Sequence, residues 1–322
     1  MSSDRKRYRQ LCDTTEDIPI FCKDWYLDII CGQDNWEVVL VEEKDEIIAA
    51  WPIYQATINK YFSIIKNPPY AQFLTPWIKP ITNPNFNEYK RTSYETKNIE
   101  QLIKLLPKFD YFNQSLHYSI RNWLPFHWAG FKQTTLYTYV IEDISNPENV
   151  LKSFASGKKQ DIKKAQKILT IKDDMSSDIF FRLHKKWLKA RDQHISYKKE
   201  FFNELVHTTL SRDAGRISYA EDQSGNILAA IYYIWDKESA YHLITTYSPE
   251  FKSSGAQALL IYDAIKFLSG KTKKYDFEGS MQQGIEYFYR SFGSVQKPYF
   301  RLSKTTSKLY KIKNAIKSVL AR

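Results

Sequence analysis

The chain has 322 residues and a net charge of +11, with 43% hydrophobic and 26% charged residues. This composition supplies both a sizeable core and a soluble surface, and it excludes collagen-like, low-complexity and mostly disordered chains. The length predicts about two domains. The sequence contains no run of about 18 apolar residues, so we expect no transmembrane helix. No apolar run follows the basic N-terminus, so we expect no secretory signal.

The cysteines and histidines show no pattern typical of a metal site. Three cysteines, Cys12, Cys22 and Cys31, cannot make a complete disulfide framework. The six histidines lack zinc-ligand spacing, and neither a nucleophile elbow nor a Walker loop is present. The sequence therefore predicts a protein of the reducing cytoplasm without a bound metal.

The positive charge lies in the second half of the chain. Residues 1–145 carry 16 Lys and Arg against 18 Asp and Glu, whereas residues 146–322 carry 31 against 18. Segment 152–199 holds 14 basic and 5 acidic residues, and segment 297–322 holds 8 basic residues and no acid. This asymmetry indicates a polyanionic partner such as nucleic acid, a diphosphate or an anionic membrane. A lysine-rich soluble surface is the alternative.

The predicted elements of the first half begin with a short amphipathic helix. In chain order we expect a helix at 21–30, strands at 36–41, 47–54 and 71–77, a helix at 98–107 and a strand at 109–116. A polar turn separates the first two strands, so they are predicted to form an antiparallel hairpin.

The second half repeats this order. After a joint at 146–169, whose last part is a very basic helix, we expect a helix at 201–210, strands at 216–220, 227–234 and 241–247, a helix at 256–270 and a strand at 274–278. The apolar segments 47–54 and 227–234 resemble each other at an offset of 180 residues, which predicts an internal duplication. The fold class is therefore α/β (α+β), with modules at 1–145 and 146–303 and a basic helix at 304–322.

Two motifs carry a resemblance to a known family. The first is Tyr-Asp-Phe-Glu-Gly-Ser at 275–280, followed by an aromatic segment that ends in Phe-Gly at 292–293. The second is the basic helix, where Lys159 is followed by Ile-Lys-Lys-Ala at 162–165. These motifs and the element order resemble tandem GNAT acyltransferases, and more narrowly the Fem aminoacyltransferases (FemABX) that extend the peptide bridge of bacterial peptidoglycan. The chain is equally similar to BioF2-like acetyltransferase-domain proteins.

The resemblance implies two GNAT-like modules, each a mixed, mainly antiparallel sheet flanked by helices, and an N-acyltransferase or aminoacyltransferase activity. The sequence departs from the family in several places: Lys159 stands where the family usually has arginine, the coiled-coil arm of some members is absent, and the aromatic pair is followed by a different residue. The family often has a lysine directly after the phenylalanine of the aromatic pair, but Tyr289 follows Phe288 here and the basic residue is Arg290.

Acyl transfer from an activated ester needs a proton acceptor for the amine and no protein nucleophile. Asp276 and Glu278 lie at the end of a predicted strand, where sites of α/β proteins usually lie, and they alternate with Phe277, so we expect both on one face. His242 on the preceding strand is a third candidate. A structural hydrogen bond or ion pair is the alternative for each.

The candidate binding residues lie around the same segments. Lys158, Lys159, Lys163 and Lys164 are predicted to hold a diphosphate or to form a solvated helix face. Arg290 is predicted either to contact the substrate or to form an ion pair with Glu286, one helical turn earlier.

The strand and turn before the last long helix supply further candidates. Tyr247 lines a cleft or belongs to an aromatic platform for RNA. The turn with Lys252 and Gly255 resembles the coenzyme A diphosphate turn of GNAT enzymes, and otherwise it is an ordinary strand-to-helix turn.

The C-terminal segment is predicted to be amphipathic. Its apolar residues fall on one helical face, which lysines flank on both sides; they are Leu309, Ile312, Ile316, Val319 and Leu320. This pattern is typical of a helix on an anionic membrane, and it also fits a helix packed on the protein's own body.

The functional hypothesis is transfer of an acyl or aminoacyl group to an amine of a cell-envelope precursor. The family implies aminoacyl-tRNA as the donor, with a peptidoglycan-type acceptor, small or lipid-linked. The second hypothesis is an acyl-CoA-dependent N-acyltransferase acting on an amino sugar or exopolysaccharide precursor. The third is a non-catalytic GNAT scaffold that binds RNA or membrane. We expect the protein in the cytoplasm, in peripheral contact with the inner face of the membrane.

Overall fold

The computed structural model describes residues 3–33, 35–83 and 85–313. The chain divides into two compact units: unit 1 is Met1–Leu136 with Pro298–Arg322, and unit 2 is Tyr137–Lys297. Among the described residues, no helix has the length and apolar content that crossing a bilayer requires.

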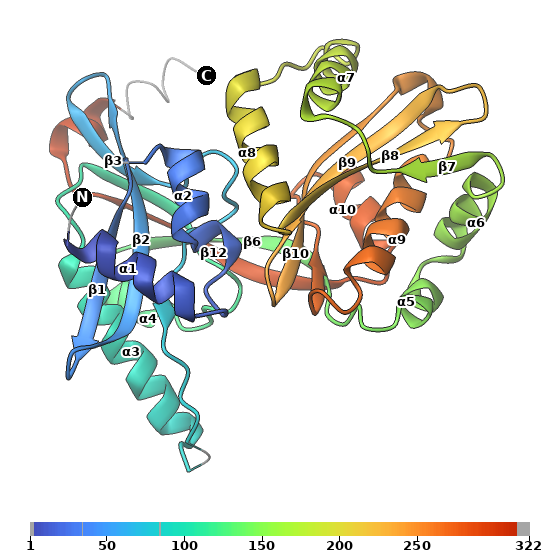
Figure 1. Cartoon of the computed structure of the whole chain (residues 1–322). Coiled ribbons are helices and arrows are strands. Elements are labelled where there is room, and N and C mark those ends of the chain that lie inside the picture. Colours follow the sequence, from blue (N-terminus) through green and yellow to red (C-terminus); the bar gives the residue numbers. More distant parts are fainter. Residues whose placement is uncertain (1–2, 34, 84, 314–322) are drawn as a thin grey trace. The chain divides into compact units, whose positions relative to one another are not determined.

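In unit 1 the strands pair in the order β1-β2-β3-β5-β12, and the short strand β4 pairs with β2 (Figure 1). Its elements are α1 (Ser3–Thr14), the 3-10 turn η1 (Ile20–Cys22), α2 (Asp24–Cys31), β1 (Glu37–Glu43), β2 (Glu46–Ile58), β3 (Phe62–Lys66), β4 (Trp77–Ile78), α3 (Glu88–Leu105), β5 (Tyr111–Ser115) and α4 (Leu124–Trp128), closed by β12 (Val295–Thr305). β3 and β5 pair in parallel, and the other neighbours are antiparallel.

Unit 2 contains a sheet in the order β6-β11-β10-β9-β8-β7. Its elements are β6 (Lys132–Ile141), α5 (Pro147–Ser153), α6 (Ser156–Ala165), β7 (Leu169–Lys172), α7 (Ser177–Lys189), α8 (Lys199–Ser211), β8 (Gly215–Asp222), β9 (Ile227–Trp235), β10 (Ser239–Tyr247), the 3-10 turn η2 (Pro249–Phe251), α9 (Ala256–Leu268), β11 (Lys274–Asp276) and α10 (Gln283–Arg290). Again one pair, β10 and β11, is parallel.

The two sheets share one plan, which confirms the predicted tandem fold. β1-β2-β3-β5 and β8-β9-β10-β11 have the same strand directions, two antiparallel pairs followed by a parallel pair. Even an irregularity is repeated, because the hairpin register shifts after Val41 in unit 1 and after Ala220 in unit 2.

The last strand of each sheet comes from the other half of the sequence. In unit 1, β5 pairs with residues 301–305 of β12, and in unit 2, β11 pairs with Val140 and Ile141 of β6. The boundaries between the units therefore lie after residues 136 and 297, whereas the sequence analysis placed them after residues 145 and 303. A pattern within one segment does not show which strand will pair with it.

The third strand of unit 1 was predicted at the wrong place. The apolar segment 71–77 contributes only Trp77 to the short strand β4, and the strand that pairs with β2 and β5 is β3 at 62–66. Segment 71–74 is buried but irregular, because the Asn67 amide donates to the carbonyl oxygens of Ala71 and Gln72 at 3.3 and 2.8 Å. In unit 2, the strand predicted at 274–278 ends at Asp276.

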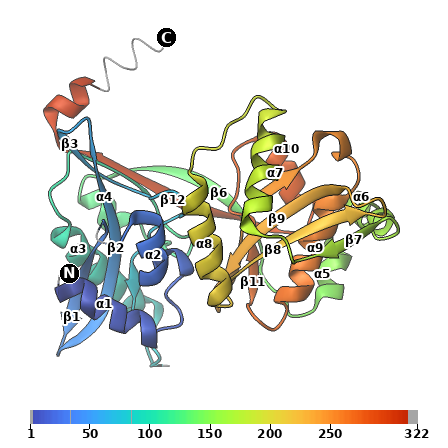
Figure 2. The same cartoon turned by 45° about the horizontal axis from the view of Figure 1, so that its top comes forward.

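The sheet of unit 2 is covered on both faces. On β9, Tyr232 contacts Phe202 and Thr209 of α8, whereas its neighbour Tyr233 belongs to the core around α9. Side chains alternate along a strand, so α8 and α9 lie on opposite faces. Figures 1 and 2 show this layering around β8 and β9.

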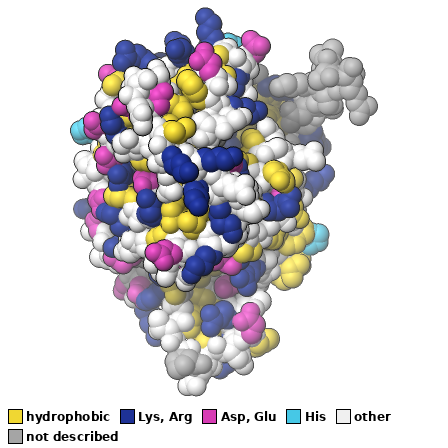
Figure 3. All heavy atoms as spheres, turned by 90° about the vertical axis from the view of Figure 1, so that its right-hand side faces the viewer, with side chains coloured by type: hydrophobic (Ala, Val, Ile, Leu, Met, Phe, Trp, Pro, Cys, Tyr) yellow, Lys and Arg dark blue, Asp and Glu magenta, His cyan; other side chains and the backbone are white. Residues whose placement is uncertain are grey.

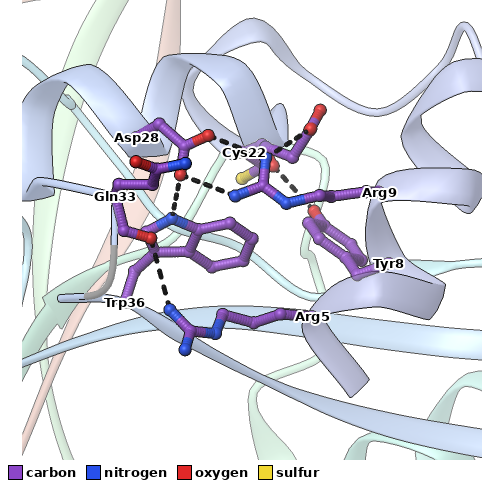
Figure 4. A network of polar contacts seen from close by, with 8 residues as sticks. Arg5, Tyr8, Arg9, Cys22, Asp28, Gln33 and Trp36 are labelled. Carbon is purple, nitrogen blue, oxygen red and sulfur yellow. Dashed lines mark hydrogen bonds and ion pairs between the residues drawn. The ribbon is translucent and has the colours of Figure 1, made fainter. Parts of the chain in front are cut away.

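A polar network ties α1 to α2 in unit 1 (Figure 4). Arg9 donates to both oxygens of Asp28, at 2.7 and 2.8 Å, and to Asp24 at 2.9 Å. The indole of Trp36 donates to Asp28 at 2.9 Å, and the Arg9 guanidinium lies 5.4 Å from that ring. The network therefore holds α1 against α2 and the indole of Trp36.

The three cysteines lie in the same unit, and all three are buried. Burial raises the pKa of the Cys12 thiol to about 12, which keeps it unreactive at neutral pH.

The described part of the C-terminal segment begins as strand. Residues 304 and 305 belong to β12, and a helix starts at Lys308. Tyr310 is buried and stacks on Tyr111 at 5.1 Å, while Leu309 and Ile312 are exposed. The helix was predicted to run to 322, and its part beyond Lys313, with Ile316, Val319 and Leu320, lies outside the described residues.

Candidate active site

The strands β10 and β11 part at one edge of the unit 2 sheet. They pair over three residues, and the last pair is Tyr241 with Asp276. β11 ends there, whereas β10 continues for six more residues to Tyr247, paired only with β9. Carboxyl ends of parallel strands that diverge are where α/β folds place their ligands. The candidate catalytic residues lie at this opening.

Asp276 is completely buried at the last position of β11. Its Oδ1 accepts hydrogen bonds from the Thr138 hydroxyl at 2.5 Å and from the Glu278 N–H at 2.8 Å. Its Oδ2 is also buried and has no hydrogen-bond partner among the residues described. Burial raises the pKa of Asp276 to about 7, and the hydrogen bond from Thr138 opposes that rise.

Glu278 and Gly279 form a left-handed corner directly after β11. Their φ angles are +59° and +72°, the first of which is unusual for a residue with a side chain. A Cβ on Gly279 would lie 2.2 Å from the carbonyl oxygen of Tyr137, so only glycine fits. The corner breaks the alternation that placed Asp276 and Glu278 on one strand face. Burial and then the Asp276 carboxylate raise the pKa of Glu278 well above its ordinary value.

Aromatic rings pack against this corner. Tyr289 of α10 stacks on Phe277 with 4.7 Å between the ring centroids, and Phe292 lies 5.4 Å from Phe277. The pKa of Tyr289 is raised by burial and by the carboxylates of Glu278 and Asp276. Tyr289 therefore occupies, near the acids, the position where the family's lysine was expected.

His242 lies in the core next to these rings. Its Nδ1 is 2.6 Å from the Tyr275 hydroxyl, and its Nε2 is hydrogen-bonded to the Thr245 hydroxyl. Burial lowers the pKa of His242 to about 4, so the ring is neutral at pH 7. Both ring nitrogens have partners, so this geometry fits the structural alternative.

Arg290 forms the ion pair that the sequence offered as its alternative role. Its Nε lies 2.8 Å from Glu286, and the same carboxylate accepts from the Tyr139 hydroxyl at 3.0 Å. The network links α10 to β6.

The four lysines of α6 do not act alike. The Lys158 ammonium lies 4.6 Å from the centroid of Phe288 and 3.4 Å from Asp161, so it ties α6 to α10. Lys159 donates to the carbonyl oxygen of Lys152 at 3.1 Å beside a shallow hollow lined by Glu148, Leu151 and Tyr262. Lys163 and Lys164 are exposed. Figure 3 shows Lys and Arg side chains spread over the side of the molecule that lies at the right of Figure 1.

The turn before α9 is shaped by its packing. Gly255 has a φ of +76°, and a Cβ there would lie 2.7 Å from the carbonyl oxygen of Asp161 in α6. The close approach of α6 therefore accounts for this glycine without a diphosphate. Lys252 is exposed in the preceding turn.

Tyr247, at the end of β10, is covered by a residue that the sequence did not indicate. The Arg191 guanidinium lies 4.4 Å from the centroid of the Tyr247 ring. Thr138 and Tyr289 were missed in the same way. Each comes from an element remote in sequence from its partner, and no local pattern marks it.

Among the described residues, no three His, Cys, Asp or Glu side chains gather as a metal site would require. Residues 156–288 match the family model of the acetyltransferase (GNAT) domain. Unit 2 carries a GNAT acyltransferase domain. This family's chemistry needs a proton acceptor and an oriented donor, which agrees with buried acids at the opening between β10 and β11. A comparison with curated proteins finds no match at a significant level.

Solved structures show the same fold over nearly the whole chain. FemX superimposes with a TM-score of 0.65 at 11% identity, covering 93% of this chain and 96% of its own. The C-terminal domain of a putative lysylphosphatidylglycerol synthetase from Agrobacterium fabrum gives 0.54 at 11% identity, covering 94% and 92%. A conserved protein of unknown function from Bacteroides thetaiotaomicron gives 0.55 at 11% identity, covering 93% and 97%. At these identities the likeness establishes the tandem GNAT fold alone.

Proposed function

We propose that the GNAT unit transfers an activated acyl or aminoacyl group to a primary amine, with Glu278 as the proton acceptor. The observation that carries this proposal is the pair of acids, Asp276 and Glu278, at the opening between β10 and β11. Unit 1 supports the assignment to unit 2. In unit 1, β5 pairs in parallel with β3 as β11 pairs with β10 in unit 2, and the last pairs are Lys66 with Asn113 and Tyr241 with Asp276. Asn113 is therefore the equivalent of Asp276, and Ser115 that of Glu278. Unit 1 has no acid at either position.

In this mechanism the amine nitrogen attacks the donor's carbonyl carbon and forms the new C–N bond. The amine proton passes to a Glu278 carboxylate oxygen, and the C–O or C–S bond to the donor's carrier breaks. The carrier leaves as an alcohol or thiol after taking up that proton. Asp276 accepts the Glu278 N–H and thereby fixes the left-handed corner that holds the base.

The raised pKa of Glu278 suits this task. An ordinary carboxylate is too weak a base to take a proton efficiently from an ammonium or attacking amine. Burial makes Glu278 a stronger base once it is ionised. Transfer should therefore increase as the pH rises through that elevated pKa.

For the substrates, we propose aminoacyl-tRNA as donor and an amine of a cell-envelope precursor as acceptor. The fold shared with FemX and with a domain named for lysylphosphatidylglycerol synthesis supports a role of this class. The basic face of α6 supports a polyanionic substrate, and the packing of Gly255 on α6 removes one reason to expect coenzyme A. The proposal places the protein in the cytoplasm, with peripheral membrane contact through 304–322.

An acyl-CoA donor is the second candidate. The observation that favours it is the start of α9, where Gly255 is the N-cap and supplies no capping side chain. Helix N-termini can bind diphosphates through their backbone N–H groups.

Labelled donors separate the candidates. Purified full-length protein is incubated with radiolabelled aminoacyl-tRNA or acetyl-CoA and an amine-bearing, nucleotide-linked peptidoglycan precursor. Label transferred only from aminoacyl-tRNA supports the first candidate, and label transferred only from acetyl-CoA supports the second. If neither donor is consumed with any amine acceptor while both bind, the protein is a non-catalytic scaffold and the proposal is wrong.

A further inference from the structure

Arg191 is held in place at the carboxyl end of β10. It follows α7, and its Nε donates to the carbonyl oxygen of Trp187 at 3.1 Å. Its guanidinium carbon lies 4.4 Å from the centroid of the Tyr247 ring, within the range of a cation–π contact. A guanidinium fixed both at Nε and over a ring is preorganised for binding.

The outer edge of this guanidinium is not used by the protein. Arg191 forms no ion pair with any described residue, and the one hydrogen bond of its side chain uses Nε. Two other arginines of unit 2 are neutralised, since Arg216 lies 2.6 Å from Asp173 and Arg290 lies 2.8 Å from Glu286. The two Nη groups of Arg191 therefore present a planar fork of donors, whose natural partner is a carboxylate or phosphate.

A second polar group, on α7 itself, has a nitrogen without a hydrogen-bond partner. His184 lies in α7, and Arg191 follows two residues after the helix ends at Lys189. His184 is 8% exposed, and its Nδ1 has no hydrogen-bond partner among the described residues. The positive charge of Arg191 is near enough to oppose protonation of this ring. The C-terminal end of α7 thus has a neutral histidine ring and a free guanidinium edge near each other.

The distance between the acids and Arg191 limits which ligands can contact both. Tyr241 pairs with Asp276, and Tyr247 lies six residues farther along β10, about 20 Å at 3.3 Å per residue. A small amine or acyl group that reacts near Glu278 does not extend that far. A substrate with an anionic group remote from its reacting end does.

We propose that Arg191 on its Tyr247 platform is a binding site for an oxyanion, a phosphate or carboxylate, on the non-reacting part of a substrate. The site deepens the proposed function, because it would orient a long nucleotide-bearing substrate along β10 toward Glu278. The sequence predicted that Tyr247 lines a cleft. In this arrangement the Tyr247 ring holds the Arg191 guanidinium in place, and the guanidinium, not the ring, contacts the anion.

Calorimetric titration of the full chain with inorganic pyrophosphate, and separately with succinate, tests the site without turnover. Arg191→Gln should weaken binding at least tenfold, and Arg191→Lys should weaken it less because it keeps the charge but loses the fork. Arg182→Gln is the matched control, since Arg182 is exposed on α7.

The two ligands identify the anion. If Arg191→Gln weakens the binding of pyrophosphate alone, the anionic group of the substrate is a phosphate. If it weakens the binding of succinate alone, that group is a carboxylate. The proposal is overturned if neither ligand binds the unmodified protein, or if Arg191→Gln binds both as well as Arg182→Gln does. Melting curves identify misfolded variants. If Arg191→Gln misfolds, the binding affinity of Arg191→Lys is the deciding measurement. If Arg191→Lys then binds both ligands as tightly as the unmodified protein, the proposal that the planar guanidinium binds the anion is overturned. Since no transfer is measured, a failed transferase assay with intact anion binding counts against the proposed function alone.

Discussion

At the scale of single residues, the account depends on acids whose environment changes their proton affinity. Asp276 is fully buried, and its ordinary pKa of 3.8 rises to about 7 mainly because burial disfavours its charge. The folded protein therefore binds a proton between these values that the unfolded chain has lost. The contribution of Asp276 to folding stability must then decrease as the pH rises from about 4 to about 7.

Asp276→Asn should remove this pH dependence. The asparagine oxygen can still accept from Thr138 and from the Glu278 N–H, so the corner is kept. Relative to the unmodified protein, the variant should gain of the order of 2 kcal/mol between pH 4 and pH 7 in urea unfolding. Asp213→Asn, which alters an exposed ion pair with Lys271, is the control and should show no such gain. A constant difference across that range would contradict the account.

His184 offers a second test at this scale. Burial first, and then the charge of Arg191, lower the pKa of His184 to about 4. Arg191→Gln should therefore raise the pKa of His184 while leaving it below 6.5, because burial remains. An NMR titration of the histidine ring protons measures this directly, and an unchanged or lower pKa would show that Arg191 does not lie near His184.

At the scale of elements, the corner after β11 depends on a glycine for two separate reasons. Gly279 and Gly225 both have left-handed φ angles, but only Gly279 is crowded, since a Cβ there would meet the Tyr137 carbonyl oxygen and one on Gly225 would meet nothing. Gly225→Ala should cost about 1 kcal/mol through backbone conformation alone. Gly279→Ala should cost about 3 kcal/mol or more in denaturant unfolding. Equal costs would contradict the close packing of β6 on the corner.

The same elements show how far the sequence could predict the structure. The hairpins 36–54 and 216–234, α9 and the acids after β11 follow from local periodicity and turn residues. The β3 strand was missed because a buried irregular segment, 71–77, has a stronger apolar pattern. Three site residues were missed because each contacts a partner that is distant in the sequence. Thr138 contacts Asp276, 138 residues away, and Arg191 contacts Tyr247, 56 residues away. Tyr289 contacts Phe277, 12 residues away. Contacts over such separations leave no local signature.

At the scale of the whole molecule, the exchange of final strands makes each half of the sequence incomplete. A fragment of residues 146–303 lacks β6, which pairs with Tyr275 and Asp276 and supplies Thr138. A fragment of residues 137–297 retains residues 137–141 of β6, which include Thr138 and both residues that pair with β11. We therefore expect the longer N-terminal boundary to raise the melting temperature, followed by circular dichroism, by at least 5 °C. If the 146–303 fragment melts as high, β6 is not required by unit 2.

The central claim is that Glu278 accepts the amine proton, and single-turnover transfer by the full chain tests it most directly. Glu278→Gln keeps the size of the side chain but cannot accept the proton as a carboxylate. Its transfer rate should fall by about 10² to 10⁴-fold, and the rise of rate with pH should disappear. Glu238→Gln, which loses only an exposed ion pair with Lys273, should keep the rate. A Glu278→Gln protein that transfers at the rate of Glu238→Gln, with the same pH profile, would contradict the account.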